Sequence, residues 1–403
     1  MATVCLTNFT VVVFSNPILG VFAADLEREF DWSRAEVALA ITIGSLTAAL
    51  LSPPIGWVVD RFGGRWVIAG AGLVMAVALA SLSGLQALWQ FYLFYAIGRG
   101  LSVGAVYNVG LIAVSNWFVQ RRPLVIGIVS VAERAGMATL PILAAVVISI
   151  AGDWRAGWVA LAVVTIALGV IPPALFIRRR PEDMGLRPDG EPTPDEDDLP
   201  PAEPDGDDFT LREAVATRAY WLMGIAIGLL MFTGGSINFH HIPYLVDQGL
   251  DRQAAASVVT VSAIVGAVGG LGGGYVAARA SARWTLVASL VAMAAGPLLL
   301  LHTESYPPAL LFAVVYGLAF GSTVAMNQAI YADYFGRTSL GVIRGSFMPV
   351  QLILNAAGPF LTGLWVDRAG SYELPFLVFG ALLLIAAGLL VLAPIPKRQP
   401  TAG

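Results

Sequence analysis

The sequence predicts an all-α polytopic membrane protein, with twelve transmembrane helices arranged in two six-helix bundles. Three observations predict this fold. The chain has 403 residues, of which 57% are hydrophobic and only 12% are charged, whereas soluble domains carry about 25% charged residues. The apolar residues fall into runs long enough to cross a bilayer, which takes roughly 20 residues. One polar stretch separates six such runs from six more.

The apolar runs define the expected spans. In the first half they are 3–25, 35–59, 66–86, 88–118, 122–150 and 156–178. In the second half they are 217–246, 251–279, 284–302, 306–335, 339–368 and 373–394. Several exceed the minimum length, so tilted or kinked helices are expected. The first run is too long for the apolar part of a signal peptide, so we expect it to remain as the first helix.

Four segments follow from this pattern. We expect an N-terminal six-helix bundle at 1–178, a cytoplasmic linker at 179–216, a C-terminal bundle at 217–396 and a cytoplasmic tail at 397–403. Proline, glycine and carboxylates dominate the linker. Such a composition cannot bury enough apolar surface to fold alone. The linker is interpreted as a solvated tether, with a regulatory docking segment as the alternative.

Basic residues are distributed unequally between the two sides of the membrane. With both termini in the cytoplasm, the inner loops carry Arg61, Arg65, Arg121, Arg122, Arg178 to Arg180, Arg279, Arg283, Arg337, Lys397 and Arg398. The outer loops hold fewer, namely Arg28, Arg34, Arg155, Arg252 and Arg368. Because cytoplasmic loops are enriched in Lys and Arg, both termini are predicted to be cytoplasmic. The expected location is the plasma (inner) membrane of a bacterium.

An internal repeat supports two related halves. The stretch IGWVVDRFGGRW at 55–66 matches GGYVAARASARW at 273–284, an offset of 218 positions. The matched pairs are Gly56 with Gly274, Arg61 with Arg279, Arg65 with Arg283, Trp66 with Trp284, Gly100 with Gly317, Gly104 with Gly321, and Phe118 with Phe335. Repeats of six spans commonly enclose a transport site at their interface.

Several motifs resemble one family. The loop GWVVDRFGGRW between the second and third spans resembles the signature loop of the major facilitator superfamily. The stretches GVFAADLEREFDWSRAEV, NWFVQRRPLVIGI and GPFLTGLWVDRAGSY are similar to its monocarboxylate-porter and oxalate/formate-antiporter branches. The resemblance implies secondary transport. The lysine that those porters carry in helix 1 falls here at about Pro17, and their helix 8 aspartate and arginine are replaced by small and apolar residues.

The signature loop is the expected gate. Its candidate residues are Gly56, Asp60, Arg61, Gly63, Gly64 and Arg65. A carboxylate at Asp60 would favour a neighbouring helix N-terminus, and the glycine pair permits a tight turn. Contacts of this kind would hold one face closed in one state and break in the other. The alternative is a static topological anchor.

Charged residues within spans are the main candidates for substrate contact. They are Arg99 in the fourth span and Glu133 with Arg134 in the fifth. A charge at the centre of a span costs about 2.5–3.5 kcal/mol on insertion scales, so it normally faces a cavity or a partner. One interpretation pairs Glu133 with Arg99 and leaves Arg134 for a substrate carboxylate. The other is a structural ion network without substrate contact.

Polar residues in both halves complete the predicted site. His240 and His241 in the seventh span, with Glu133, are the candidates for proton coupling because histidine titrates near neutral pH. Further substrate-binding candidates are Tyr107, Asn108, Asn238, His241, Asn327, Gln328, Gln351 and Asn355. Each of these polar side chains has interhelical hydrogen bonding as its alternative role.

Other classes of function lack support in the sequence. No Ser-His-Asp, H-E-x-x-H or C-x-x-C arrangement occurs, Cys5 is the only cysteine, and no basic patch suggests nucleic acid. We therefore expect no enzyme, metal or cofactor, and a monomer in the lipid bilayer. The predicted function is alternating-access transport of a small organic anion, coupled to protons or exchange. The alternatives are an efflux carrier for drug-like amphipathic compounds and a non-transporting sensor on the same fold.

Overall fold

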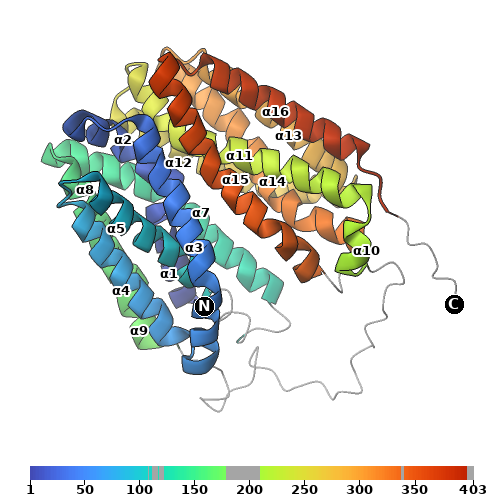
Figure 1. Ribbon diagram of the computed structural model, residues 1–403, viewed down its shortest axis with the longest axis horizontal. Coiled ribbons are helices and arrows are strands. Elements are labelled where there is room, and N and C mark those ends of the chain that lie inside the picture. Colours follow the sequence, from blue (N-terminus) through green and yellow to red (C-terminus); the bar gives the residue numbers. More distant parts are fainter. Residues whose placement is uncertain (108, 111–116, 118–121, 178–208, 337–339, 397–403) are drawn as a thin grey trace.

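The computed structural model describes residues 1–107, 109–110, 117, 122–177, 209–336 and 340–396. Every regular element in these ranges is a helix. Figure 1 shows the first half, in blue to green, beside the second half, in yellow to red. The prediction of an all-α fold with two helical bundles is confirmed.

The first half begins with a broken span, α1 (Ala2–Val11), η1 (Val12–Phe14) and α2 (Asn16–Phe30). It continues with α3 (Arg34–Phe62), α4 (Gly64–Leu82), α5 (Leu88–Leu101) and η2 (Ser102–Tyr107). Its last helices are α7 (Arg122–Ala151) and the segmented span α8 (Trp154–Val164), η3 (Thr165–Val170) and α9 (Ile171–Phe176).

The second half contains α10 (Leu211–Val215), α11 (Arg218–Asp247), α12 (Arg252–Ala277), α13 (Ala282–Leu300), α14 (Tyr306–Phe335), α15 (Leu340–Ala369) and α16 (Glu373–Leu392). Eleven helices within the described ranges are long and apolar enough to cross a membrane. The remaining expected span, 88–118, consists of α5 and η2 and then enters residues outside those ranges.

The first span is interrupted, whereas the sequence pattern predicted one continuous helix. Ser15 adopts an extended conformation (φ −77°, ψ 161°) between η1 and α2, and Pro17 occupies the first turn of α2. Proline has no N–H to donate to the preceding turn and clashes with a continuing helix, so it favours a new start. The break leaves backbone carbonyls in the interior that need new donors.

The internal repeat is visible in side-chain contacts. Arg65 donates from Nε to the Ala174 carbonyl (2.7 Å), and its repeat mate Arg283 donates from Nε to the Leu390 carbonyl (3.0 Å). Both carbonyls belong to the last span of their own half. Each guanidinium also lies over the tryptophan that follows it, Trp66 or Trp284. The two arginines therefore hold equivalent positions in the two bundles.

Small residues let helices approach closely at equivalent places. A Cβ atom at Gly104 would lie 3.0 Å from the Ala48 carbonyl oxygen, and one at Gly321 only 1.8 Å from that of Gly266. Position 266 is 218 residues after position 48, the same offset as in the repeat. The contacts of α3 with the span formed by α5 and η2, and of α12 with α14, are thus two versions of one helix pair.

Part of the expected linker is ordered and packed. Residues 178–208 lie outside the described ranges, but α10 forms within 209–216, where we expected only a tether. Thr210 and Glu213 form a capping box at its start. Phe209 is buried against Phe335, and its N–H bonds to the Phe335 carbonyl (3.0 Å). The second half therefore begins before residue 217.

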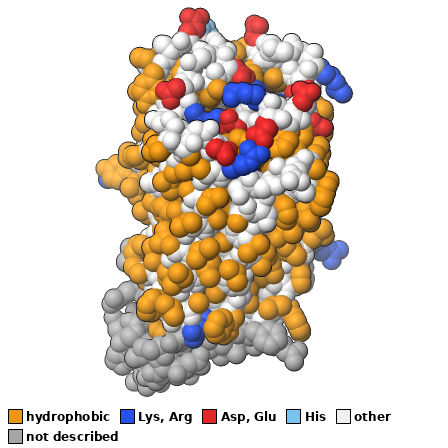
Figure 2. All heavy atoms as spheres, turned by 90° about the vertical axis from the view of Figure 1, so that its left-hand side faces the viewer, with side chains coloured by type: hydrophobic (Ala, Val, Ile, Leu, Met, Phe, Trp, Pro, Cys, Tyr) orange, Lys and Arg blue, Asp and Glu red, His pale blue; other side chains and the backbone are white. Residues whose placement is uncertain are grey.

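The largest contacts between the halves are made by three helix pairs, α2 with α11, α3 with α15, and α7 with α12. Side-chain hydrogen bonds to backbone carbonyls cross all three pairs: Asn16 donates to the Gly235 carbonyl, Thr42 to that of Ala356, and Thr260 to that of Ala138. We call the end with the N-terminus, α9 and α10 the linker end, because α9 and α10 flank the linker in sequence, and the opposite end the far end (Figure 1). Acidic and basic side chains gather at the far end, above a hydrophobic band (Figure 2).

Candidate functional site

A cavity of about 50 Å³ lies between the two halves. Pro17, Arg134 and Met137 line it from the first half. The second half contributes Asn238, His241, Val259, Ser262, Ala263, Phe312, Tyr316, Gly317 and Phe320. The cavity is central because its walls come from α2, α7, α11, α12 and α14. Space of this size fits a few water molecules or a group of a few atoms.

Arg134 is the charged group of the cavity wall. Its guanidinium lies 6.0 Å from the centre of the Phe320 ring. Within the described ranges it makes no hydrogen bond and no ion pair. Glu133 is near enough for its charge to act on Arg134 but lies beyond ion-pair distance. A half-buried guanidinium with unused donors is suited to a planar anion.

The break in the first span brings a helix start to the same wall. Ser15 precedes α2 without capping it through its side chain, and Pro17 lines the cavity. The first N–H groups of a helix lack partners within the helix, and they mark the positive end of its dipole. The start of α2 therefore adds to the positive character that Arg134 gives this wall.

His241 faces the cavity with one ring nitrogen already committed. Its Nδ1 lies 2.7 Å from the Ile237 carbonyl. Because a carbonyl only accepts, Nδ1 carries the hydrogen, and neutral His241 keeps a lone pair on Nε2. Nearby, Tyr316 donates its hydroxyl to Asn238 Oδ1 (3.3 Å). The predicted residues Arg134, Asn238 and His241 thus line one cavity.

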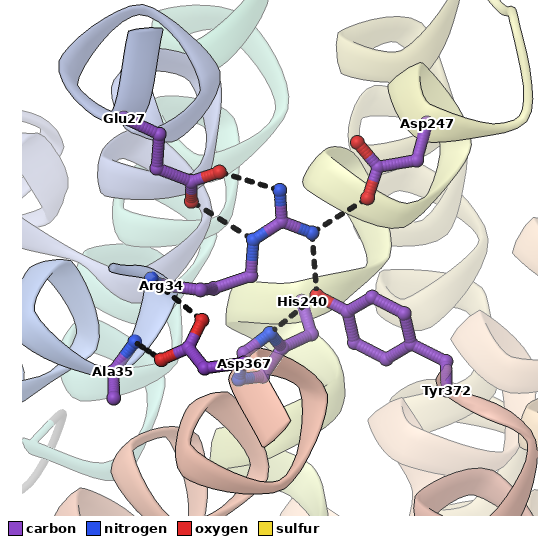
Figure 3. Close-up of polar contacts among 7 residues, drawn as sticks. All are labelled: Glu27, Arg34, Ala35, His240, Asp247, Asp367 and Tyr372. Carbon is purple, nitrogen blue, oxygen red and sulfur yellow. Dashed lines mark hydrogen bonds and ion pairs between the residues drawn. The ribbon is translucent and has the colours of Figure 1, made fainter. Parts of the chain in front are cut away.

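His240 belongs to a different place. It is fully buried, and its Nε2 lies 2.8 Å from the Pro359 carbonyl, so this nitrogen donates. Its Nδ1 then accepts from the Tyr372 hydroxyl (2.9 Å). The ring is therefore a neutral link in a hydrogen-bonded network at the far end (Figure 3).

Arg34 is the centre of that network. Its Nε and Nη2 donate to the two oxygens of Glu27 (2.8 and 2.6 Å). Its Nη1 donates to Asp247 (2.6 Å) and to the Tyr372 hydroxyl (2.9 Å). Glu27 belongs to the first half, whereas Asp247 and Tyr372 belong to the second, so one guanidinium holds the halves together (Figure 3).

Asp367 adds a second link across the same junction. Its carboxylate accepts from the backbone N–H groups of Arg34 (3.0 Å) and Ala35 (2.9 Å), the first residues of α3. A Cβ atom at Gly363, one turn earlier in α15, would lie 2.8 Å from Ala35. Close backbone approach and a charged cap therefore occur together. A separate ion pair, Arg252 with Asp25, also crosses at this end (2.5 Å).

These contacts close the far end. In the described part of the chain, every hydrogen bond and ion pair between the halves lies from mid-span to the far end. Burial raises the pKa of the Tyr372 phenol, while Arg34 beside it acts in the opposite direction. The raised pKa keeps the hydroxyl protonated, as its donation to His240 requires.

Arg99 does not pair with Glu133, so that interpretation is wrong. Arg99 is buried, and it donates to Ser45 Oγ (3.1 Å) and to the Phe14 carbonyl (2.6 Å). Tyr95 donates to the same carbonyl (3.0 Å). Both side chains satisfy the carbonyl that the break in the first span leaves unpaired. Arg99 is thus structural and does not line the cavity.

The other predicted residues differ in their surroundings. Gln351 donates to Tyr331 (3.1 Å) and Asn355 to the Met231 carbonyl (3.1 Å), so both bond within the second half. Asn327 has a buried Oδ1 without a hydrogen-bond partner. Tyr107 lies where the charges of Glu133 and Arg134 act on its hydroxyl. Asn108 and the side chain of Gln328 lie outside the described parts.

The predicted gate at the linker end is described only in part. Gly63 has φ +82°, a conformation that glycine adopts without strain, and Gly64 begins α4. Arg65 bonds within its own half, as above. The side chains of Asp60 and Arg61 and the surroundings of Gly56 lie outside the described parts. Their gating role remains a prediction.

The sequence reasoning missed the network at the far end. Arg34 was counted only as an outer-loop arginine, and Glu27, Asp247, Asp367 and Tyr372 were not singled out. A signal existed, because the stretches at 20–37 and 358–372, which carry Glu27, Arg34 and Asp367, were noted for resemblance. The aromatic wall of the cavity, Phe312, Tyr316 and Phe320, was also missed.

Comparison with known proteins agrees with the fold. The sequence profile of the Major Facilitator Superfamily matches residues 4–279 and, overlapping, 224–403. Human monocarboxylate transporter 11 is 24% identical over 396 residues, covering 96% of this chain and 80% of that protein. The agnestins efflux protein AgnL12 of Paecilomyces divaricatus is 25% identical over 394 residues, covering 96% and 85%.

Among solved structures, a bacterial homologue of the human lysosomal transporter Spinster, in an inward-facing and occupied conformation, superimposes with a TM-score of 0.74. It is 16% identical, with 99% of this chain and 98% of that chain covered. The nucleoside transporter NupG gives 0.72 at 13% identity, with 97% and 98% covered. The resemblance to the monocarboxylate branch and the absence of an enzymatic role are thereby supported. The chain belongs to the Major Facilitator Superfamily and is a multi-pass membrane transporter of small molecules.

Proposed function

We propose that this transporter carries a small organic anion, a carboxylate, by alternating access. The observation that supports it most is Arg134, a guanidinium that faces the central cavity and has no anionic partner within ion-pair distance in the described ranges. Keeping an uncompensated charge at mid-membrane is unfavourable. A carboxylate substrate would neutralise it, and the guanidinium can donate two parallel hydrogen bonds to that group.

Coupling to a proton or to exchange is part of the proposal. Glu133 adjoins Arg134 in sequence, and His241 presents Nε2 at the cavity wall. A proton on either group would change the charge of the cavity that binds the substrate. Protonation would therefore favour one of the two conformations, inward-open or outward-open, through a difference in affinity. The protein is proposed to act as a monomer, with both termini cytoplasmic, in the inner membrane of a bacterium.

Alternating access also needs a closure that can open. The Arg34 network at the far end is the proposed closure on that side. Its partners are carboxylates and a phenol that water can hydrate when the halves part. The signature loop with Asp60 and Arg61 is the proposed counterpart at the linker end.

Efflux of amphipathic compounds is a second candidate function. It is favoured by the aromatic and apolar character of the cavity wall. The apolar and aromatic residues Pro17, Met137, Val259, Ala263, Phe312, Tyr316 and Phe320 outnumber the polar residues Arg134, Asn238, His241 and Ser262. Such a wall would accept bulky apolar solutes, with Arg134 as a minor contact.

Binding and flux measurements test the proposal. Purified protein in detergent is screened by thermal shift against small carboxylates and against neutral and cationic compounds. A ligand that binds the folded state raises Tm with its occupancy. Stabilisation by a carboxylate is expected, with loss in Arg134→Ala, partial retention in Arg134→Lys and no change in the control Arg155→Lys at the far end. Saturable flux of the carboxylate into proteoliposomes should likewise be lost in Arg134→Ala, partly retained in Arg134→Lys and unchanged in Arg155→Lys. Carboxylate binding that survives Arg134→Ala overturns the proposal, and stabilisation only by neutral or cationic compounds favours efflux.

A further inference from the structure

Three aromatic rings form a ladder along the cavity wall. Phe312 and Tyr316 stack with ring centroids 5.1 Å apart and an interplanar angle of 24°. Tyr316 and Phe320 stack at 5.6 Å and 8°. The three residues are spaced by four along α14, so they share one helix face. We call this surface the aromatic ladder.

The ladder has no structural need to face a cavity. Aromatic side chains of a bundle usually fill the space between helices or face lipid. Here all three rings line the central cavity, and Tyr316 is nearly fully buried with its hydroxyl on Asn238. Nearly parallel rings present a continuous flat surface. A flat surface of this kind favours a planar π-system that stacks with an offset or meets it edge-on.

The anion-binding group lies at one end of the ladder. Arg134 is 6.0 Å from the Phe320 ring, the last ring of the three towards the linker end. The guanidinium is thus already paired with an aromatic face, through a cation–π contact. A ligand with both a carboxylate and an aromatic ring would satisfy each group with its own partner.

We propose that the preferred substrates are aryl carboxylates, with the carboxylate on Arg134 and the aromatic ring against Phe320 and Tyr316. This inference rests on the proposed function and narrows its substrate class. It also accounts for two features that a lactate-sized anion leaves unused, the length of the ladder and its flatness.

The two contacts lie on opposite halves. Arg134 is on α7 of the first half, and the ladder is on α14 of the second. A ligand that bonds to one and stacks on the other therefore bridges the halves. The present cavity, about 50 Å³, is small for a ring and a carboxylate together. We expect the bound state to have the halves slightly farther apart at this level, with the ligand as the link.

Matched ligands test the inference on the full chain in detergent. Benzoate, cyclohexanecarboxylate, lactate and benzamide are titrated by calorimetry or thermal shift. Benzoate and cyclohexanecarboxylate share charge and approximate size, but only benzoate has an aromatic face. We expect benzoate to bind about threefold to tenfold more tightly than cyclohexanecarboxylate, because aromatic pairs are stabilised beyond their buried area. Benzamide, which lacks the charge, is expected to bind at least tenfold more weakly than benzoate.

Variants locate the effect. Phe320→Leu is expected to reduce benzoate affinity about threefold to tenfold and to reduce lactate affinity by a smaller factor, because lactate has no ring to stack on Phe320. Phe320→Tyr keeps the ring and should keep the preference, which guards against a leucine variant that folds poorly. The control is Phe232→Leu, another half-buried phenylalanine that packs on Phe379 and does not line the cavity.

The outcomes separate this inference from the proposed function. If benzoate and cyclohexanecarboxylate bind equally and both need Arg134, the inference fails while the organic-anion function stands. If no carboxylate binds in an Arg134-dependent manner, the proposed function fails and the inference fails with it. If benzamide matches benzoate, the ladder binds rings without regard to charge, and the inference is overturned in favour of amphipathic efflux.

Discussion

Asp367 caps the helix that begins at Arg34, although 333 residues separate the two in the chain. A carboxylate of the second half accepts hydrogen bonds from the first two N–H groups of the helix, which have no partner within it. The local capping box is present too, because Ser33 and Glu36 bond reciprocally. The start of α3 is therefore held by both halves at once, and separation of the halves removes one of its two caps.

Replacing Arg34 should open the far end. Arg34→Ala leaves Glu27 and Asp247 without their cation, and breaking a buried pair in this way costs about 3–5 kcal/mol. The Arg34–Asp247 contact exists only when the far end is closed, so part of this free energy is lost from the closed state and not from the open one. We expect faster modification of an introduced Asn238→Cys by a membrane-impermeant thiol reagent added at the far end, with Cys5 replaced. Arg34→Lys should be intermediate, and the surface control Arg28→Lys should match the parent. Equal labelling in all variants would contradict a gating role.

Asp367 should contribute less than Arg34 and through different atoms. Asp367→Ala removes an acceptor from two backbone N–H groups, a loss typical of helix caps at about 0.5–2 kcal/mol. Asp367→Asn keeps one acceptor oxygen, so it should retain part of the effect. The same labelling assay measures both. A larger effect from Asp367→Ala than from Arg34→Ala would contradict this ranking.

Tyr372 should make closure insensitive to pH near neutrality. Burial raises the pKa of its phenol above the ordinary value of about 10. A group whose pKa is raised on folding contributes stability that is present below the unfolded value and lost as pH rises through the folded value. The contribution of Tyr372 to closure should therefore be lost only on the alkaline side. Tyr372→Phe should remove this alkaline loss and weaken closure at every pH. A neutral-range shift in thiol labelling caused by Tyr372→Phe would argue against this assignment.

Glu133 and His241 can be distinguished by the pH profile of transport. If Glu133 carries the coupling proton, Glu133→Gln should abolish the pH dependence of flux. Equilibrium exchange of substrate across the membrane should remain intact. If His241 carries the coupling proton, His241→Gln should abolish the pH dependence of flux instead. His240→Gln is the comparison, because His240 bonds to Tyr372 and Pro359 away from the cavity. It should impair closure without flattening the profile. A profile unchanged in both cavity variants would clear both residues of the role.

Close packing of α12 and α14 should be intolerant of a single methyl group. A Cβ atom at Gly321 would lie 1.8 Å from the Gly266 carbonyl oxygen, so Gly321→Ala forces two backbones apart. We expect little folded protein or a Tm lower by several degrees, since overpacking costs about 1–3 kcal/mol or more. Gly272→Ala on α12 meets nothing within 4 Å and is the matched control. A normal Tm in Gly321→Ala would contradict the packing.

The sequence was sufficient for the spans and the repeat because both depend on local patterns. Apolar runs indicate the segments that lie in lipid. The constant offset between residues such as Arg65 and Arg283 indicates equivalent positions in the two halves. The partner of Arg99 could not be predicted in this way. It depends on a carbonyl that becomes free only because the chain breaks after Phe14. The same limit applies to Arg34, whose partners come from helices distant in sequence.

Arg134 lay between these cases. Its place within a span marked it as functional or paired. The choice depended on whether Glu133 pairs with Arg99 and leaves Arg134 for substrate, or all three form a structural ion network. Only packing decides such distances, since residues adjacent on a helix point about 100° apart. The neutral amides Gln351 and Asn355 were overestimated for the same reason. Polarity within a span does not reveal which side faces the cavity.

The break at Ser15 has a consequence for movement. Before it, the chain is anchored to its own half, with the carbonyl of Phe14 held by Arg99 and Tyr95. After it, Asn16 bonds to Gly235, and Gly20 lies close to the Phe239 carbonyl of the other half. The two segments of the first span, before and after Ser15, are therefore bound to different bundles. We expect α2 to move with the second half for part of the transport cycle. The solute would then pass through an occluded state, closed to both sides of the membrane, before the cavity opens to the other side.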